Sequence, residues 1–238
     1  MDNAFYILLA AFLSGVAGTG LGGLIGVMFP RITELSLKRM LSATAGLMLA
    51  IVCFELLPES MEGSTLWGCI GLMAGVLGML LLSPLVRADN EKLRAGKLVS
   101  AGIALHNFPE GLAIGASMAG SGLLGMSLAL TIALHDIPEG VAMALPLREG
   151  GTGRRKAVWA AVISGIPTVL GAAVGIWLGG VGQGALAFSL GLAGGAMLEV
   201  TCCQLLPEST DKRTGGSLMA GLLFGAAICF LLHNGLHH

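Results

Sequence analysis

Charged and aromatic side chains are scarce in this sequence. Charged residues make up 11% and aromatic residues 5% of its 238 positions, with a single tyrosine. Soluble domains usually carry about 25% charged residues, so the composition excludes an ordinary soluble enzyme. The net charge is −1, and we expect no nucleic-acid partner.

Two further absences concern cysteine spacing and the N-terminus. No pair of cysteines has the spacing of a metal finger or a disulfide framework. We interpret the adjacent Cys202 and Cys203 as small buried thiols, with soft metal ligands as the alternative. The sequence starts Met1-Asp2-Asn3, without the basic region of a signal peptide, so we interpret the first apolar run as a retained span.

Apolar runs fill nearly the whole length instead. Hydrophobic residues make up 55% of the chain, mean hydropathy is +0.85 and glycine occurs 38 times. A helix needs about 20 apolar residues to cross a bilayer. We therefore predict an all-α integral membrane protein, a single transmembrane transporter domain over residues 1–238. Its eight expected spans are approximately 4–28, 40–58, 65–86, 98–119, 122–146, 157–180, 184–208 and 215–236.

All 13 lysine and arginine residues lie in four connections between these runs, at 29–39, 87–97, 147–156 and 209–214. With eight crossings, these connections share one side of the membrane. Cytoplasmic loops carry an excess of Lys and Arg. We therefore expect a multi-pass protein of the plasma (inner) membrane, with basic loops in the cytoplasm and both termini outside.

Two fifteen-residue segments repeat one another. Gly46–Ser60 reads GLMLAIVCFELLPES and Gly195–Ser209 reads GAMLEVTCCQLLPES, with nine of fifteen positions identical. In the predicted topology they run in opposite directions, as in the inverted repeats of many transporters. We expect a 3+2+3 organisation, in which spans one to three correspond to spans six to eight.

A shorter repeat carries more chemistry. Residues 104–113 read ALHNFPEGLA and residues 133–142 read ALHDIPEGVA, with seven of ten positions identical. Both lie near the middle of antiparallel spans, so their polar groups can meet at one depth. Residues three and four apart share a helix face. In the first motif, His106 and Asn107 therefore lie on the same helix face as Glu110. In the second, His135 and Asp136 lie on the same face as Glu139.

The motifs also contain proline and glycine. Pro109 and Pro138 each remove a backbone donor, which frees the carbonyls of Leu105 and Leu134. The glycines that follow, at 111 and 140, allow a neighbouring helix to approach closely.

Two interpretations of these residues are a cation-binding site and a set of hydrogen bonds between helices, and electrostatics favours the first. Glu110, Asp136 and Glu139 lie at membrane depth, and no expected span contains Lys or Arg. A charge at the bilayer centre costs about 3 kcal/mol on insertion scales. The acids therefore require protons or a cation. Two imidazoles, three carboxylates and an amide suit Zn²⁺, Fe²⁺, Mn²⁺ or Cd²⁺, whereas Mg²⁺ and Ca²⁺ prefer all-oxygen sites.

The segments HNFPEG and HDIPEG resemble the signature of the ZIP (Zrt-, Irt-like) family of divalent metal transporters, in its bacterial GufA-like branch. The resemblance extends over the whole chain and implies a binuclear metal site in a transport path. It places one metal on His106, Glu110, His135 and Glu139, with Met48 nearby. It places the second metal on Asn107, Glu110, Asp136 and Glu139.

The sequence departs from the family pattern in spans six and seven. Thr168 stands where a glutamate usually supplies the second metal site, which weakens the expectation of that site. Cys203-Gln204 stands where His-Glu often faces the cytoplasm, and Glu199 lies one turn earlier. We hypothesise that Glu55 and Glu59 attract cations at the entrance, and that Glu199 and Glu208 assist at the exit. For Glu59 and Glu208, interfacial acids beside a helix-ending proline are an equally good interpretation.

Together these patterns predict a secondary transporter that carries a divalent transition metal, foremost Zn²⁺, toward the cytoplasm. We expect no enzyme and no catalytic cofactor; the bound metal is the cargo. The alternatives are an intramembrane zinc-dependent hydrolase and a metal-selective channel. The hydrolase is disfavoured because the sequence has no HExxH motif. Glycine patterns such as Gly171/Gly175/Gly179 leave a homodimer interface open.

Overall fold

The structure is a computed structural model that describes residues 2–28, 33–120, 122–177 and 182–236. These residues are almost entirely helical. The helices are α1 Asp2–Ala11, η1 Phe12–Ala17, α2 Gly18–Met28, α3 Glu34–Ile51, η2 Val52–Leu56, α4 Leu57–Leu82, η3 Ser83–Leu85, α5 Glu91–Gly120, α6 Gly122–Glu149, α7 Arg154–Trp177, α8 Gln183–Val200, η4 Thr201–Leu205, α9 Leu206–Ser209 and α10 Gly215–Leu236.

Short polar residues start and stop these helices at the charged end of the bundle. Thr33 caps α3, because its hydroxyl accepts a hydrogen bond from the Ser36 N–H at 3.2 Å. Asn90 caps α5 through a 2.8 Å bond from the Leu93 N–H, and its amide donates to the Gly150 carbonyl at 3.0 Å. Helix α6 ends at Glu149, and the chain turns at Gly151, whose φ of 97° suits glycine.

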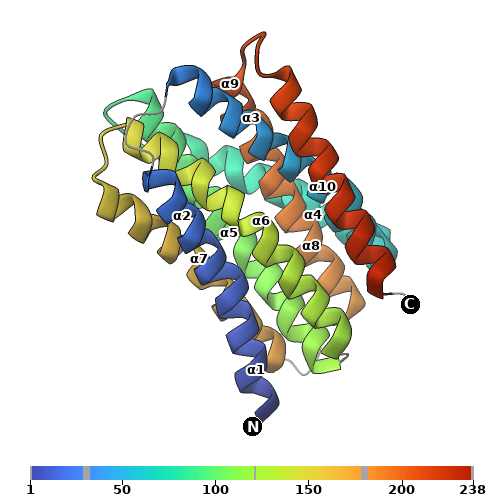
Figure 1. Cartoon of the computed structure of the whole chain (residues 1–238). Helices are drawn as coiled ribbons and strands as arrows, with labels where there is room; N and C mark the ends of the chain where they lie inside the picture. The colour runs from blue at the N-terminus through green and yellow to red at the C-terminus, as the bar shows by residue number, and fades with distance from the viewer. Residues whose placement is uncertain (1, 29–32, 121, 178–181, 237–238) are drawn as a thin grey trace.

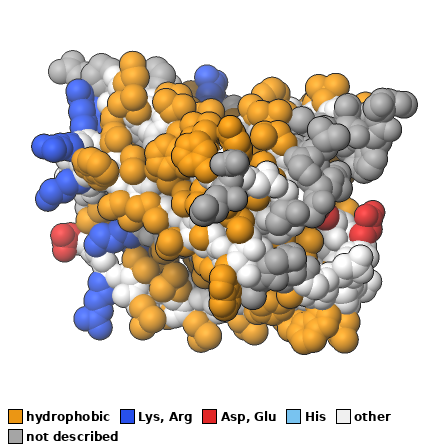
Figure 2. All heavy atoms as spheres, turned by 90° about the horizontal axis from the view of Figure 1, so that it is seen from below, with side chains coloured by type: hydrophobic (Ala, Val, Ile, Leu, Met, Phe, Trp, Pro, Cys, Tyr) orange, Lys and Arg blue, Asp and Glu red, His pale blue; other side chains and the backbone are white. Residues whose placement is uncertain are grey.

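The bundle's outer surface is apolar. Within the described residues, five helical stretches are long and apolar enough to cross a membrane: Asn3–Met28, Glu34–Leu85, Leu128–Glu149, Arg154–Trp177 and Gln183–Ser209. Large side chains such as Phe5, Leu81 and Trp177 are exposed, and hydrophobic atoms dominate the face in Figure 2. A soluble monomer rarely exposes so much contiguous apolar surface. The structure is that of an α-helical membrane protein.

One of these stretches is too long for a single crossing. Glu34–Leu85 has 52 residues, about 78 Å of helix at 1.5 Å per residue, against about 30 Å of hydrocarbon. Ser64 interrupts it, with φ −172° and ψ 109°. The break falls between the predicted spans 40–58 and 65–86, so the stretch divides into two segments of crossing length.

The long helices lie roughly along one direction in an elongated bundle (Figure 1). Helix α4 packs along α8, and α3 packs along α10; on the other side of the bundle, α5 packs along α7 and α2 along α6. Helices α5 and α6 also pack on each other. Figure 1 shows the start of α1 and the end of α10 toward one end of the bundle, opposite the α6–α7 and α9–α10 connections.

Glycines set how closely the helices approach. A Cβ atom added at Gly111 would overlap the Thr168 carbonyl on α7, and one added at Gly140 would overlap the Thr19 carbonyl on α2. The prediction that these two glycines allow close approach is confirmed. Helix backbones in direct contact of this kind are typical of membrane bundles.

Two π-helical turns occupy equivalent places in the fifteen-residue repeat. Val52–Leu56 forms η2 and Thr201–Leu205 forms η4, and each starts six residues after the first glycine of its segment. A π turn inserts one extra residue into a helix and is frequent at functional sites. The two segments therefore share an irregular backbone feature as well as sequence.

The interpretation of Cys202 and Cys203 as buried thiols is wrong. Both are exposed, as are Cys53 and Cys69, and Cys229 is buried. The adjacent thiols of Cys202 and Cys203 lie in η4, at the surface of the bundle, and face outward. An apolar sequence run does not separate positions that face outward from those that face the core.

Candidate metal centre

The paired motifs lie in the middle of α5 and α6. Both helices continue through their prolines, Pro109 and Pro138, without interruption. All six polar side chains singled out from the sequence are at most 2% exposed: His106, Asn107, Glu110, His135, Asp136 and Glu139. The two helices pack against each other, so the motifs meet inside the bundle as their antiparallel placement predicted.

Each histidine faces the glutamate of the other motif. His106 Nε2 lies 3.0 Å from Glu139 Oε2, within hydrogen-bond distance. His135 Nε2 lies 3.5 Å from Glu110 Oε1 and 3.8 Å from Asp136 Oδ1. The first pair is closed by a direct contact, while the second leaves its atoms too far apart for a good hydrogen bond.

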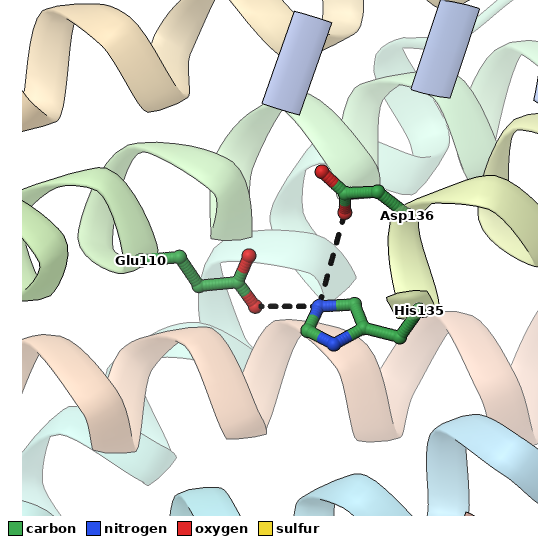
Figure 3. Close-up of side chains that lie close together, drawn as sticks. All are labelled: Glu110, His135 and Asp136. Carbon is green, nitrogen blue, oxygen red and sulfur yellow. Dashed lines mark ion pairs between the residues drawn. The ribbon is translucent and has the colours of Figure 1, made fainter. Parts of the chain in front are cut away.

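The wider spacing suits a shared metal ion. Two ligands of a tetrahedral Zn²⁺, at about 2.1 Å each, stand about 3.4 Å apart. Glu110, His135 and Asp136 each offer an atom, and these atoms lie within 4.8 Å of one another. Figure 3 shows the Glu110 and Asp136 carboxylates turned toward the same ring nitrogen of His135. Among the residues that the structure describes, this trio is the group whose atoms converge closely enough to hold a metal.

Several of the cluster's polar atoms lack a hydrogen-bond partner among the described residues. Both carboxylate oxygens of Glu110 and of Asp136 are buried without a hydrogen bond, as is the Nδ1 atom of each histidine. A buried polar group left unpaired costs about 1–3 kcal/mol. These atoms therefore have coordination capacity that a cation, protons or water would use.

Asn107 behaves differently from its counterpart Asp136. Its amide Nδ2 donates to the Ser164 carbonyl on α7 at 2.9 Å, which ties α5 to α7. Its Oδ1 remains without a partner among the described residues. Sequence reasoning did not identify Ser164 in this role, because a backbone carbonyl acceptor leaves no signal in residue type.

Thr168 occupies the position of the expected glutamate. It is fully buried, and its hydroxyl has no hydrogen-bond partner in the described part of the chain. The Gly15 backbone lies directly against the Thr168 side chain. The position faces the helix interface with a hydroxyl in place of a carboxylate.

Three other sequence candidates lie on α3, α8 and η4. Met48 is buried, and its Sδ atom accepts a hydrogen bond from the Thr201 hydroxyl at 3.7 Å. Glu199 is buried, with Oε2 lacking a partner in the described structure, whereas Cys203 is exposed. The contacts of Met48 connect α3 to η4.

Comparison with known proteins identifies the family. The sequence pattern of the family described as "ZIP Zinc transporter" matches residues 89–233, which include both motif helices. This chain belongs to the ZIP family. The ZIP match covers the helices that hold the His/Glu cross pairs, while Met48 lies outside it.

Individual ZIP relatives match over a shorter region. The chain is 30% identical to the zinc transporter ZupT of Salmonella paratyphi A over 140 residues, which is 52% of this chain and 54% of the relative. It is 31% identical to ZupT of Corynebacterium glutamicum over 138 residues, which is 46% of this chain and 51% of the relative. The chain thus spans about half the length of the curated relatives it matches.

Proposed function

We propose that this ZIP chain is a secondary transporter that carries divalent transition-metal ions, foremost Zn²⁺, across the membrane toward the cytoplasm. The observation that supports it most is the convergence of Glu110, His135 and Asp136 inside the bundle. The relatives named as zinc transporters and the ZIP family support the same conclusion. Fe²⁺, Mn²⁺ and Cd²⁺ are the other cations that the ligand set suits.

The proposed binding site includes both cross pairs. Glu110, His135 and Asp136 supply the primary ligands, and His106 with Glu139 completes the site when the metal separates their 3.0 Å contact. Asn107 adds an amide oxygen, Oδ1, without releasing its bond to Ser164. A cation here balances carboxylates that have no Lys or Arg in the expected spans. Met48 is proposed only as a neighbouring residue.

We propose eight crossings: the five apolar stretches, with Glu34–Leu85 counted as two because it divides at Ser64, together with α5 and α10. The repeat relates span one to six, two to seven and three to eight. Under that relation the α4–α8 pair corresponds to α3–α10, and the α5–α7 pair corresponds to α6–α2. Contacts of both kinds are present. The matched pairs and the shared π turns support the inverted 3+2+3 organisation.

The orientation follows from charge. In Figure 2 most of the visible Lys and Arg side chains lie toward one end of the face, and the charged side chains visible at the opposite end are acidic. We propose that the basic end faces the cytoplasm, with both termini outside, in the plasma membrane.

A hydrolase is the weaker alternative. Such an enzyme needs an open metal position with an activated water and a general base. The ZIP family match points to transport. A channel is distinguished by flux that does not saturate with metal concentration, because a carrier binds each ion before moving it.

Protons are proposed to exchange with the metal. Carboxylates and imidazoles bind metal through lone pairs that protons also occupy, so metal binding releases protons. Apparent affinity should therefore fall as pH drops from about 8 to about 5. A flat profile over that range would count against exchange.

The decisive experiment is metal uptake into proteoliposomes that contain the full chain. We expect saturable Zn²⁺ uptake that Glu110→Ala and Glu139→Ala abolish, with Glu62→Ala as a matched control at a residue outside the motifs. A panel of Zn²⁺, Cd²⁺, Fe²⁺ and Mn²⁺ would rank the cargo. Saturable uptake that persists in both motif variants would refute the assignment of the site.

A further inference from the structure

A second cluster lies outside the paired motifs, where η2, α6 and α10 meet. The Cys229 thiol on α10 donates a hydrogen bond to Glu55 Oε2 at 3.5 Å. The Thr131 hydroxyl on α6 hydrogen-bonds to the same carboxylate. Cys229 is buried, so this is a thiol, a carboxylate and a hydroxyl gathered from three elements inside the bundle.

This cluster adjoins the candidate metal centre through α6. Thr131 and His135 are four residues apart on one helix, so their side chains share a face about one 5.4 Å turn apart. The Nδ1 atom of His135 has no partner in the described structure, and Figure 3 shows this nitrogen pointing away from Glu110 and Asp136.

The spacing of sulfur and oxygen in the cluster is that of two ligands on one ion. A tetrahedral Zn²⁺ with a thiolate at about 2.3 Å and a carboxylate oxygen at about 2.1 Å separates them by about 3.6 Å. The observed Sγ to Oε2 distance is 3.5 Å. An ion placed between the two atoms would displace the thiol proton and bind the thiolate.

We propose that Glu55 and Cys229, with Thr131 beside them, form a second metal-binding site for thiophilic divalent cations such as Zn²⁺ and Cd²⁺. The thiolate favours these ions over Mn²⁺ and Mg²⁺. As a step on a transport path, the site rests on the function proposed above. As a binding site, it stands on its own geometry.

The repeat has no equivalent site on its other half. Gln204 occupies the position that corresponds to Glu55, and Gly102 corresponds to Thr131. The Val200 side chain presses on Gly102, and a Cβ atom there would also lie 3.3 Å from Met79 Cε. The place is filled by apolar groups. An ion is therefore held beside His135 from one side of the centre only, the side proposed to face out.

The test uses Co²⁺ and the full chain purified in detergent. Cobalt bound to a thiolate has an intense ultraviolet charge-transfer band that carboxylate and imidazole ligands do not produce. We expect the band in the wild type, its loss in Cys229→Ser, and its shift or weakening in Glu55→Gln. Cys69→Ser is the matched control, because Cys69 is exposed and its thiol hydrogen-bonds the Met61 sulfur rather than a carboxylate. We expect the control to keep the band.

Competition by Cd²⁺ and Mn²⁺ measures the selectivity. Loss of the thiolate should weaken Cd²⁺ binding at this site about tenfold or more and leave Mn²⁺ binding nearly unchanged. Glu110→Gln should retain the band, so a failed central site and a failed second site give different results. If Cys229→Ser does not elute as a single species, Glu55→Gln, which keeps the thiol, carries the test. A band absent from the wild type, or one that survives both substitutions, would overturn the proposal.

Discussion

The two motif helices carry nearly the same sequence and hold their polar groups differently. On α5, Asn107 donates to the Ser164 carbonyl at 2.9 Å. On α6, the corresponding Asp136 has no proton to donate when ionised, and both its oxygens lack a hydrogen bond in the described structure. The amide of Asn107 therefore links α5 to α7, whereas the carboxylate of Asp136 has both oxygens available to a cation.

The histidines differ in the same way. His106 is in direct contact with Glu139 at 3.0 Å, whereas His135 lies 3.5 Å from Glu110. The repeat thus places the same kinds of side chain on both helices at different distances. Helix α6 supplies two of the three converging side chains, so we expect it to be the more sensitive to substitution.

The largest expected effect comes from Asp136→Asn, which gives α6 the α5 sequence at this position. The variant keeps its shape and loses a ligand, so Zn²⁺ affinity should fall about hundredfold. Isothermal titration in detergent measures it. The reciprocal Asn107→Asp removes the bond to Ser164 and should cost about 1–3 kcal/mol of stability, with affinity within about tenfold of the wild type. Equal losses of affinity in the two variants would show that the roles are not divided.

A smaller difference is expected between the histidines. His135→Gln should weaken Zn²⁺ binding about tenfold more than His106→Gln, because only His135 belongs to the converging trio. Zn²⁺-dependent increase of the apparent Tm reports both, since a ligand that binds the folded state stabilises it. Glutamine retains polarity and similar size in each variant. A larger effect at His106 would reverse the order that the distances indicate.

Helices α5 and α6 resemble each other in how closely their motif glycines approach a neighbouring helix backbone. We therefore expect substitutions of these glycines to lower stability by similar amounts. Gly111→Ala and Gly140→Ala each force a methyl group into a neighbouring helix backbone, at a cost of about 1–3 kcal/mol. Gly78→Ala is the control, because the nearest atom to its added Cβ is Leu105 Cδ2 at an ordinary 3.8 Å. Apparent Tm in detergent should fall for the first two and stay constant for the third. A fall for only one motif glycine would break the correspondence.

The smallest effect is expected outside the membrane, in the α9–α10 connection. Arg213 hydrogen-bonds Asp211 at 3.1 Å and lowers the pKa of that carboxyl from 3.8 to about 2. Because the pKa is depressed, the stabilisation is present above the unfolded value and is lost only as pH falls through about 2. Asp211→Asn should therefore leave the pH dependence of Zn²⁺ uptake between about pH 5 and 8 unchanged. A changed profile would place part of that dependence in this loop.

Sequence reasoning was most successful where the chemistry resides in residue type. The membrane character and the ZIP family followed from apolar runs and from HNFPEG and HDIPEG, while the metal-binding role of the motif residues stays a prediction. A break in Glu34–Leu85 was expected between the predicted spans 40–58 and 65–86, and Ser64 marks it. The glycine contacts of α5 and α6 were expected because glycine lacks a side chain.

What depends on contacts between distant residues was not predicted. The bond from Asn107 to Ser164 needs the register of α5 on α7, and the bond from Cys229 to Glu55 needs α10 against η2. The outward orientation of Cys202 and Cys203 depends on a π turn, which shifts the register of every residue after it and has no sequence signature of its own. The difference between the 3.0 Å contact of His106 with Glu139 and the 3.5 Å separation of His135 from Glu110 likewise depends on how the helices pack.

The π turns have a historical consequence. An inverted repeat arises when a gene segment is doubled and its second copy is inserted with opposite orientation in the membrane. Under the proposed repeat, η2 and η4 hold their extra residue at the same offset, although their side chains differ at three of five positions. On that proposal, the extra residue belongs to the half that was doubled. The two turns differ in the side chain they present, Glu55 in η2 and Gln204 in η4, while both have the same irregular backbone.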